Sequence, residues 1–240
     1  MVVLLSLWQW FGTSSSDHAL FASSPTRIIA SGQALVASGE LATDVGVSGR
    51  EFIYGFGLAI LTGIPLGVVM GWYRYLEALL DPIVNFFYAT PRIAFLPLLI
   101  IWLGLGITSK VALVYSGAVF AILINTISGV KNLEESLLLQ AHSFGATDFQ
   151  VFRTIALPGS VPFIISGLRL GLGHALIGVV VGELYAATAG VGYLIAVSGN
   201  ILQTDKVMVG VIIIAGMGVT CTAILKRIEE HFQSWRPQHA

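Results

Sequence analysis

The stretch Lys131–Pro158, KNLEESLLLQAHSFGATDFQVFRTIALP, is the longest polar segment in a chain that is otherwise mostly apolar. We call this stretch the island. It contains two short helical patterns, from Glu134 to Phe144 and from Thr147 onward, joined at Gly145, a residue that commonly ends a helix. A protein this apolar normally keeps its polar connections short, so the island predicts a docking element presented to a soluble partner.

The second helical pattern of the island has a capping signal at its start. Thr147 and Gln150 match the reciprocal T-x-x-Q pattern of a helix N-terminus, and we expect this helix to end before Pro158. The island also offers an apolar surface, formed by Phe144, Phe149, Phe152 and Ile155. An alternative interpretation is an ordinary amphipathic loop that packs on its own helix bundle.

The composition places the whole chain in a membrane. Hydrophobic residues make up 55% of the 240 residues and charged residues 10%, and the mean hydropathy is +0.85; soluble domains carry about 25% charged residues. Three charge-free stretches are long enough to cross a hydrocarbon core of about 30 Å: Phe52–Tyr73, Val111–Val130 and Val207–Leu225. Two more, Leu79–Gly104 and Pro162–Glu183, are interrupted by prolines or ionisable residues. Met1–Gly12 is apolar but short, and we interpret it as the outer part of a first span.

These stretches are continuous rather than alternating, which is typical of helices and not of a barrel. The sequence therefore predicts an all-α integral membrane protein with about six transmembrane helices, the first of them short.

Several functions are excluded or disfavoured by what the sequence lacks. It has no G-x-x-x-x-G-K-[ST] phosphate loop, so it does not hydrolyse ATP by that route. The net charge of −1, without a basic run, argues against nucleic acid. The five histidines are scattered without metal-ligand spacing, and the lone Cys221 lies in an apolar stretch, as a small buried hydrophobe would. We expect no enzyme activity, no bound metal and no cofactor in this chain.

Two of the apolar stretches contain several glycines each. Gly63, Gly67 and Gly71 repeat every four residues, the pattern that lets helix backbones approach closely in lipid. A second glycine-rich run lies in the fifth predicted span, and we expect it to form the contact between two copies of the chain. Its members are Gly167, Gly171, Gly173 and Gly178.

Four ionisable residues lie within predicted spans and are candidates for a solute pathway or gate, because such residues are costly in lipid. They are Arg92, Arg169, His174 and Glu183. Arg92 lies between Pro91 and Pro97, which we expect to break the helix, and its guanidinium would attract an anion. Arg169 has an alternative role in snorkelling at a helix end, and Glu183 has one as a loop anchor.

The island also carries a family resemblance. Ala141, Gly145, Ile155, Leu157 and Pro158 fall in register with the EAA motif of permease subunits in binding-protein-dependent ABC importers. The chain departs from that motif at its start, where Leu139 replaces the glutamate, Gln140 the first alanine and His142 a frequent arginine. The strings ATPRIAFLPLLIIWLGLG, INTISGVKN, SGLRLGLG and AGVGYLI are similar to the nitrate, sulfonate and taurine branch of the family.

The resemblance implies a six-helix permease that works as a homodimer in the bacterial inner membrane. It implies two cytoplasmic ATPase subunits, which bind ATP and magnesium, and an extracytoplasmic binding protein that delivers a small organic or inorganic anion. It places the ATPase contact on Ala141, His142, Gly145, Ala146, Asp148, Phe149, Phe152 and Pro158.

On this basis residues 1–45 form a short transmembrane segment and an extracytoplasmic amphipathic region. Residues 46–237 form the permease domain, with the cytoplasmic coupling loop at 131–158. The distribution of positive charge agrees weakly with this orientation. The predicted inner segments hold Arg74, Lys131, Arg153, Lys226, Arg227 and Arg236, and the outer ones Arg27, Arg50, Lys110 and Lys206.

A self-contained secondary transporter or channel is the competing interpretation. That class predicts an internally repeated hydropathy pattern and coupling carboxylates at mid-membrane, and we find neither in the sequence. The single large polar island fits a partner-driven permease better.

Overall fold

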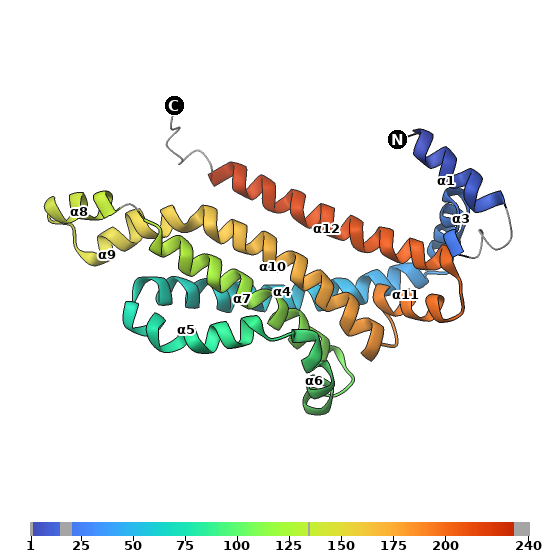
Figure 1. Ribbon diagram of the computed structural model, residues 1–240, viewed down its shortest axis with the longest axis horizontal. Coiled ribbons are helices and arrows are strands. Elements are labelled where there is room, and N and C mark those ends of the chain that lie inside the picture. The colour runs from blue at the N-terminus through green and yellow to red at the C-terminus, as the bar shows by residue number, and fades with distance from the viewer. Residues whose placement is uncertain (1, 15–20, 134, 233–240) are drawn as a thin grey trace.

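The computed structural model describes residues 2–14, 21–133 and 135–232, and these residues form helices without any strand. The helices lie in an elongated bundle, with the island at one end and the N-terminal helices at the other (Figure 1). Their bounds are α1 Val2–Ser14, α3 Pro25–Ala37, α4 Glu40–Trp72, α5 Arg74–Ala89, η1 Arg92–Phe95, α6 Leu96–Leu103, α7 Ile107–Lys131, α8 Glu135–Ser143, α9 Asp148–Val151, η2 Phe152–Ala156, α10 Leu157–Ala186, α11 Val191–Asn200 and α12 Thr204–Phe232.

Among the described residues, four helices are long and apolar enough to span a membrane: α4, α7, α12 and the continuous helix Asp148–Ala186. The pair formed by α5 and η1–α6 is a fifth candidate span, bent by 87°. These candidate spans, with the short α1 before them, confirm the predicted all-α membrane architecture.

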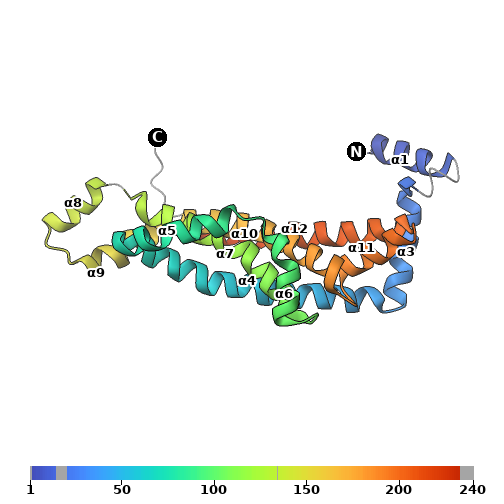
Figure 2. The same cartoon turned by 60° about the horizontal axis from the view of Figure 1, so that its bottom comes forward.

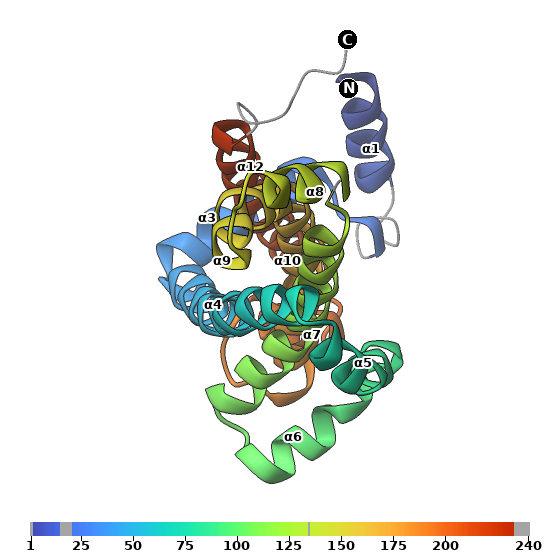
Figure 3. The ribbon, with the colours of Figure 1, turned by 90° about the vertical axis from the view of Figure 1, so that its left-hand side faces the viewer.

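The centre of the bundle is a three-helix core of α4, α7 and α10 (Figures 1 and 3). Phe52 and Phe56 of α4 pack there against Val114 of α7 and Leu172 of α10. The other helices pack around this core, and only 11% of the apolar stretch of α12 is buried, as expected of a helix that faces lipid or another subunit.

The predicted glycine repeat brings α4 and α7 close together, as expected. A Cβ atom added at Gly67 would lie 2.9 Å from the carbonyl oxygen of Leu123 and 2.7 Å from Cβ of Thr126. Similar close approaches to α7 occur at Gly63 and Gly71. Only glycine allows the two backbones to pack at this separation.

The second glycine run, for which a contact with a second copy of the chain is predicted, mostly contacts α7 of the same chain instead. Gly167, Gly171 and Gly178 pack against α7 of the same chain, because an added Cβ would lie 3.0–3.3 Å from its backbone atoms. Only Gly173 of this run faces open space. Most of these glycines are therefore used inside the bundle, and they give no argument for a contact between two copies.

The helix break that Pro91 and Pro97 predict is present in the structure. α5 ends at Ala89, one short turn (η1) contains Arg92, and Pro97 lies in the first turn of α6. Proline has no backbone N–H to continue a helix, so the chain turns here and α6 projects away from the core (Figure 3).

The helix that leaves the island does not end before Pro158, contrary to the expectation. It runs without a break from Asp148 to Ala186, and its Phe152–Ala156 segment has the wider π-helical turn. A π-turn changes the backbone register next to a proline, where one helical hydrogen bond is missing. This local widening lets the helix continue through Pro158.

The glycine contact predicts a specific loss of stability. Gly67→Leu should force α4 and α7 apart and lower the apparent melting temperature of the detergent-solubilised protein by several degrees, because the new side chain meets backbone at under 3.0 Å. Gly57→Leu on the same helix is the matched control, since nothing lies within 4 Å of an added Cβ there. Equal melting temperatures for the two variants, measured by scanning fluorimetry, would contradict the close packing.

Candidate functional site

The island projects beyond the helix core at one end of the molecule (Figure 2). Gly145 ends α8 with φ +79°, a left-handed conformation that suits glycine. The N–H of Ala146 donates to the carbonyl of Ala141 and that of Gly145 to His142, which is a Schellman turn. The predicted capping box is present as well, with Thr147 and Gln150 satisfying each other's backbone groups. Both ends of the turn are therefore fixed.

The apolar side chains of the island divide into two groups. Phe144 and Phe149 point outward, with 91% and 69% of their surface exposed. Phe152 instead packs edge-to-face on Trp72, at the end of α4, with a ring separation of 5.1 Å. The island is thus attached to the bundle through Phe152, while its tip remains uncovered. This arrangement does not match a loop that packs on its own bundle.

A pocket of about 390 Å³ lies at the bend of the broken span, between η1, α7 and α10. It brings together two predicted pathway residues, Arg92 and His174, which come from different helices. Among the described residues, the hydrogen-bond acceptors of Arg92 are backbone carbonyls, Tyr88 for Nη2 at 3.2 Å and Gly117 for Nη1 at 3.4 Å. Its guanidinium lies 5.3 Å from the centre of the Tyr88 ring, and its buried Nε has no hydrogen-bond partner in the described part of the chain.

The other two predicted pathway residues lie elsewhere. Arg169 pairs with Glu229 of α12, with 2.5 Å between Nη2 and Oε2. Glu183 is fully buried near the opposite end of α10 from the island. The structure therefore groups Arg92 with His174 and separates both from Arg169 and Glu183.

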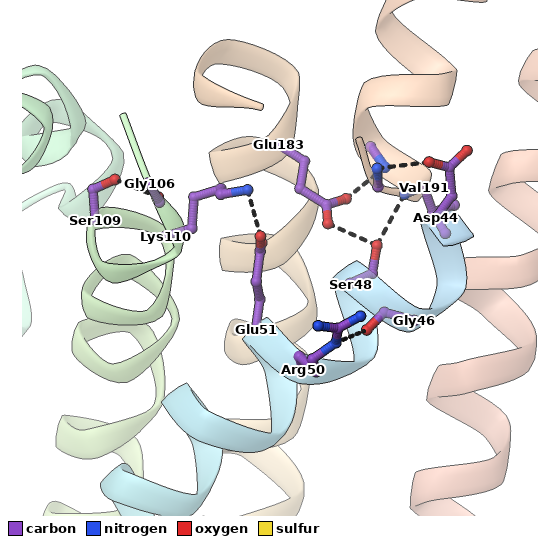
Figure 4. Close-up of polar contacts among 12 residues, drawn as sticks. Asp44, Gly46, Ser48, Arg50, Glu51, Gly106, Ser109, Lys110, Glu183 and Val191 are labelled. Carbon is purple, nitrogen blue, oxygen red and sulfur yellow. Dashed lines mark hydrogen bonds and ion pairs between the residues drawn. The ribbon is translucent and has the colours of Figure 1, made fainter. Parts of the chain in front are cut away.

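Glu183 belongs to a buried polar network that holds the start of α11 (Figure 4). Its Oε2 accepts from the backbone N–H of Gly192 at 2.7 Å, and its Oε1 accepts from Ser48 at 2.7 Å. Ser48 accepts in turn from the N–H of Val191, and Asp44 from that of Gly190. Three consecutive N–H groups at the α11 N-terminus are thus capped by side chains of α4 and α10.

An ion pair extends this network to α7. Lys110 Nζ contacts Glu51 Oε1, and both side chains are almost completely buried. Lys110 is the counter-charge of the Glu51 carboxylate among the described residues. The pair is therefore held by charge, and it links α4 to α7 beside the bonds that link α4 to α10 and α11 (Figure 4).

The sequence did not lead us to place Asp44, Ser48, Glu51 or Lys110 in a buried site. A signal was present, because Asp44, Ser48 and Glu51 follow the i, i+4, i+7 spacing that places polar groups on one helix face. Lys110 carried no such signal, since it lies at the start of a different helix. No group of three or more His, Cys, Asp or Glu side chains in the described part of the chain is placed to hold a metal ion.

A core of apolar helices long enough to span a membrane, with an exposed polar island at one end, defines a multi-pass membrane protein. Residues 63–236 match the family model of the binding-protein-dependent transport system inner membrane component. The chain belongs to this family of ABC importer permeases and is a multi-pass inner-membrane protein.

Individual relatives agree with the family. The chain is 31% identical to the taurine transport system permease TauC of Escherichia coli, over 98% of its own length and 87% of that protein. It is 32% identical to the putative aliphatic sulfonates transport permease SsuC of Bacillus subtilis, over 98% and 85%. The riboflavin transport system permease RibX of Chloroflexus aurantiacus is 30% identical, over 98% and 88%.

The fold is also found among solved structures. An inward-facing structure of the MetNI methionine ABC transporter matches with a TM-score of 0.58, at 19% identity, covering 76% of this chain and 94% of that one. At this identity the likeness supports the fold alone.

The ion pair between Lys110 and Glu51 generates a stability prediction. Lys110→Met should destabilise the protein by about 3–5 kcal/mol, because it leaves a buried carboxylate without its counter-charge. The double variant Lys110→Met/Glu51→Met should recover most of this loss, since no buried charge remains unpaired. Thermal unfolding of the purified protein measures both. A double variant no more stable than the single one would show that the pair is not the source of the effect.

Proposed function

We propose that the chain is the solute-conducting subunit of an ATP-driven importer, that it acts as a homodimer, and that the island transmits movement of two cytoplasmic ATPase subunits. The observation that carries this proposal is the exposed, rigidly capped island, which continues directly into a core helix. ATP and magnesium belong to the partner subunits, and we propose no cofactor for this chain.

The contacts of the island support its role as a lever. α9, η2 and α10 form one continuous helix, so a displacement of α9 also displaces the core. Phe152 makes a second connection through Trp72 to α4. A partner can drive transport only if its contact differs between inward- and outward-facing states. An element attached to two core helices is suited to such a contact.

The proposed ATPase contact centres on the tip of the island. Phe149 and the Gly145 turn face outward, and exposed aromatic residues often anchor protein interfaces. His142 lies near Asp148, with 3.9 Å between Nε2 and Oδ1, a contact that joins the two helices at the tip. The remaining proposed coupling residues are Ala141 and Ala146 at the tip, and Phe152 and Pro158 where the island joins the bundle.

The other partners are assigned by exposure and position. The largely unburied apolar stretch of α12 and the projecting bent span offer surfaces for a second copy or for lipid. The end opposite the island, where α3 and α11 lie (Figure 1), is the end that we assign to the extracytoplasmic binding protein.

We propose a small organic anion as the solute. The relatives named for taurine and aliphatic sulfonates favour it, whereas the relative named for riboflavin shows that relatives alone do not fix the solute class. The specific support within the chain is Arg92, a cation that faces a pocket at the broken span. His174 shares this pocket; we assign Arg169 to helix pairing and Glu183 to anchoring the start of α11.

The docking role of the island can be tested by changing its exposed tip. Phe149→Glu should reduce recovery of the ATPase with the purified permease by about tenfold or more, because a charge replaces an exposed aromatic anchor. Folding should not change, since Phe149 is 69% exposed. The readout is the amount of ATPase retained on an affinity-tagged permease, together with ATP-dependent uptake in proteoliposomes.

The matched control is Tyr75→Glu, an exposed aromatic residue of α5 outside the island. It should retain the ATPase at the wild-type level. Full ATPase retention and full uptake in Phe149→Glu would exclude the tip of the island as the coupling site, and uptake without any ATPase would favour a secondary transporter.

A further inference from the structure

We propose that a second pocket, at the end of the molecule opposite the island, receives a basic side chain of the extracytoplasmic binding protein, an arginine or a lysine. Glu40 and Asp44 of α4 pair with its charge. We call this space the outer pocket. The inference rests on the proposed function and deepens it, because that proposal assigns only one end of the molecule to the binding protein, whereas the outer pocket gives the chemistry of the contact.

The outer pocket lies where three helices meet at that end (Figure 1). It is lined by the first residues of α4, by α11 and by the start of α12, together with the loop that follows α10. Its volume of about 340 Å³ lies within the range of small-molecule sites, and it is large enough to admit one long side chain. None of the four predicted pathway residues lines it, so it is separate from the pocket at the bend of the broken span.

The first argument is negative charge without a counter-charge. Asp44 is only 5% exposed, and its Oδ1 accepts from the N–H of Gly190 at 2.8 Å. In the described part of the chain its other oxygen has no hydrogen bond and the carboxylate has no cationic partner, and Figure 4 shows that oxygen turned away from the N–H. A buried carboxylate is costly without a paired charge. Glu40, one helical turn earlier, adds a second carboxylate to the same pocket. A cation in the outer pocket would compensate both.

The second argument is the sign of the total charge. Glu40, Asp44 and Lys206 are the charged residues that line the outer pocket, so its net charge is −1. Lys206 lies on the α12 side, and among the described residues no ion pair joins it to either carboxylate. A site of net negative charge attracts cations and repels anions. The anionic solute that we propose is therefore not the occupant of this pocket.

The third argument is the division of the lining between polar and apolar sides. The carboxylates belong to α4, whereas Leu194, Val197 and Ile201 line the pocket from α11 and its end. Arginine and lysine carry an aliphatic stem below a charged head. Such a side chain can pack its stem on the apolar residues while its head reaches the carboxylates. A small inorganic cation would leave the apolar side unused.

The test is the affinity of the purified binding protein of the same transport system for the permease–ATPase complex in nanodiscs, measured by biolayer interferometry. Asp44→Asn should weaken binding by about tenfold or more, because it removes a charge-assisted hydrogen bond. Its amide oxygen can still accept from the N–H of Gly190, so the start of α11 keeps its cap. Glu40→Gln should weaken binding by about two- to tenfold, since Glu40 is exposed and its charge is screened by solvent.

Lys206→Gln gives a result of opposite sign. It removes the positive charge that opposes a cation, and it should strengthen binding by about twofold or more. Damage to the fold would not tighten binding. The matched control is Arg50→Gln, which removes an exposed arginine of α4 that donates to Gly46 in its own helix. It should bind like wild type, which separates a local contact from a general effect of net charge.

Two further measurements identify the occupant. An excess of butylguanidinium, which mimics an arginine side chain, should displace the binding protein, and the neutral butylurea should not. In a scan that replaces each basic surface residue of the binding protein by glutamate, one variant should bind the Glu40→Lys permease more tightly than it binds the wild-type permease. If no variant does so, the occupant is not a basic side chain of the binding protein.

Several other results would overturn the outer pocket as the contact. They are equal affinity of wild type, Asp44→Asn and Glu40→Gln, binding no tighter in Lys206→Gln, and saturable binding of butylguanidinium that leaves the affinity for the binding protein unchanged. If Asp44→Asn fails to fold, Glu40→Gln and Lys206→Gln still decide the outcome. A binding protein that does not bind the wild-type complex refutes the proposed function, whereas tight binding that is insensitive to the pocket variants refutes only this contact.

Discussion

Polar and charged groups inside a membrane must be satisfied by the protein itself, and this constraint organises the half of the bundle that lies away from the island. Glu183, Ser48 and Asp44 satisfy three N–H groups at the start of α11. The Lys110–Glu51 ion pair joins α4 to α7 beside them. The helices α4, α7, α10 and α11 are thus joined by polar interactions. If one of these helices moved alone, its polar groups would be left without partners in lipid. Arg92 stands apart from this network, because its charge has no carboxylate partner in the described structure.

The glycine contacts act on the same helices in a complementary way. They let α4, α7 and α10 approach closely, which strengthens packing in an environment where burial of apolar surface gives little driving force. The polar network then fixes the relative position of these helices along their length. Close packing and polar bonding together favour movement of the core as one body. The island, the bent span and α12 are attached to that body by fewer contacts.

Features that depend on neighbouring residues in the sequence could be predicted. The capping box at Thr147, the stop at Gly145 and the break at Pro91 are all present, because each follows from the backbone chemistry of a few consecutive residues. The end of a helix before Pro158 was predicted wrongly, since a π-turn can absorb the proline. Features that depend on pairing between distant segments could not be derived. The partner of the second glycine run and the pairing of Lys110 with Glu51 are decided by how helices meet, which a single sequence does not specify.

The continuous helix Asp148–Ala186 has a mechanical consequence. Its 39 residues span about 58 Å at about 1.5 Å per residue, whereas the hydrocarbon core is only about 30 Å thick. A substantial part of the helix therefore extends beyond the hydrocarbon core as a rigid arm. This arm tilts together with the part of the helix that lies in the membrane. Tilting an arm of about 20 Å by about 10° displaces its tip by about 3–4 Å, a distance comparable to the rise of two or three helical residues. Small rotations in the membrane thus correspond to movements at the tip that are large enough to remake side-chain contacts.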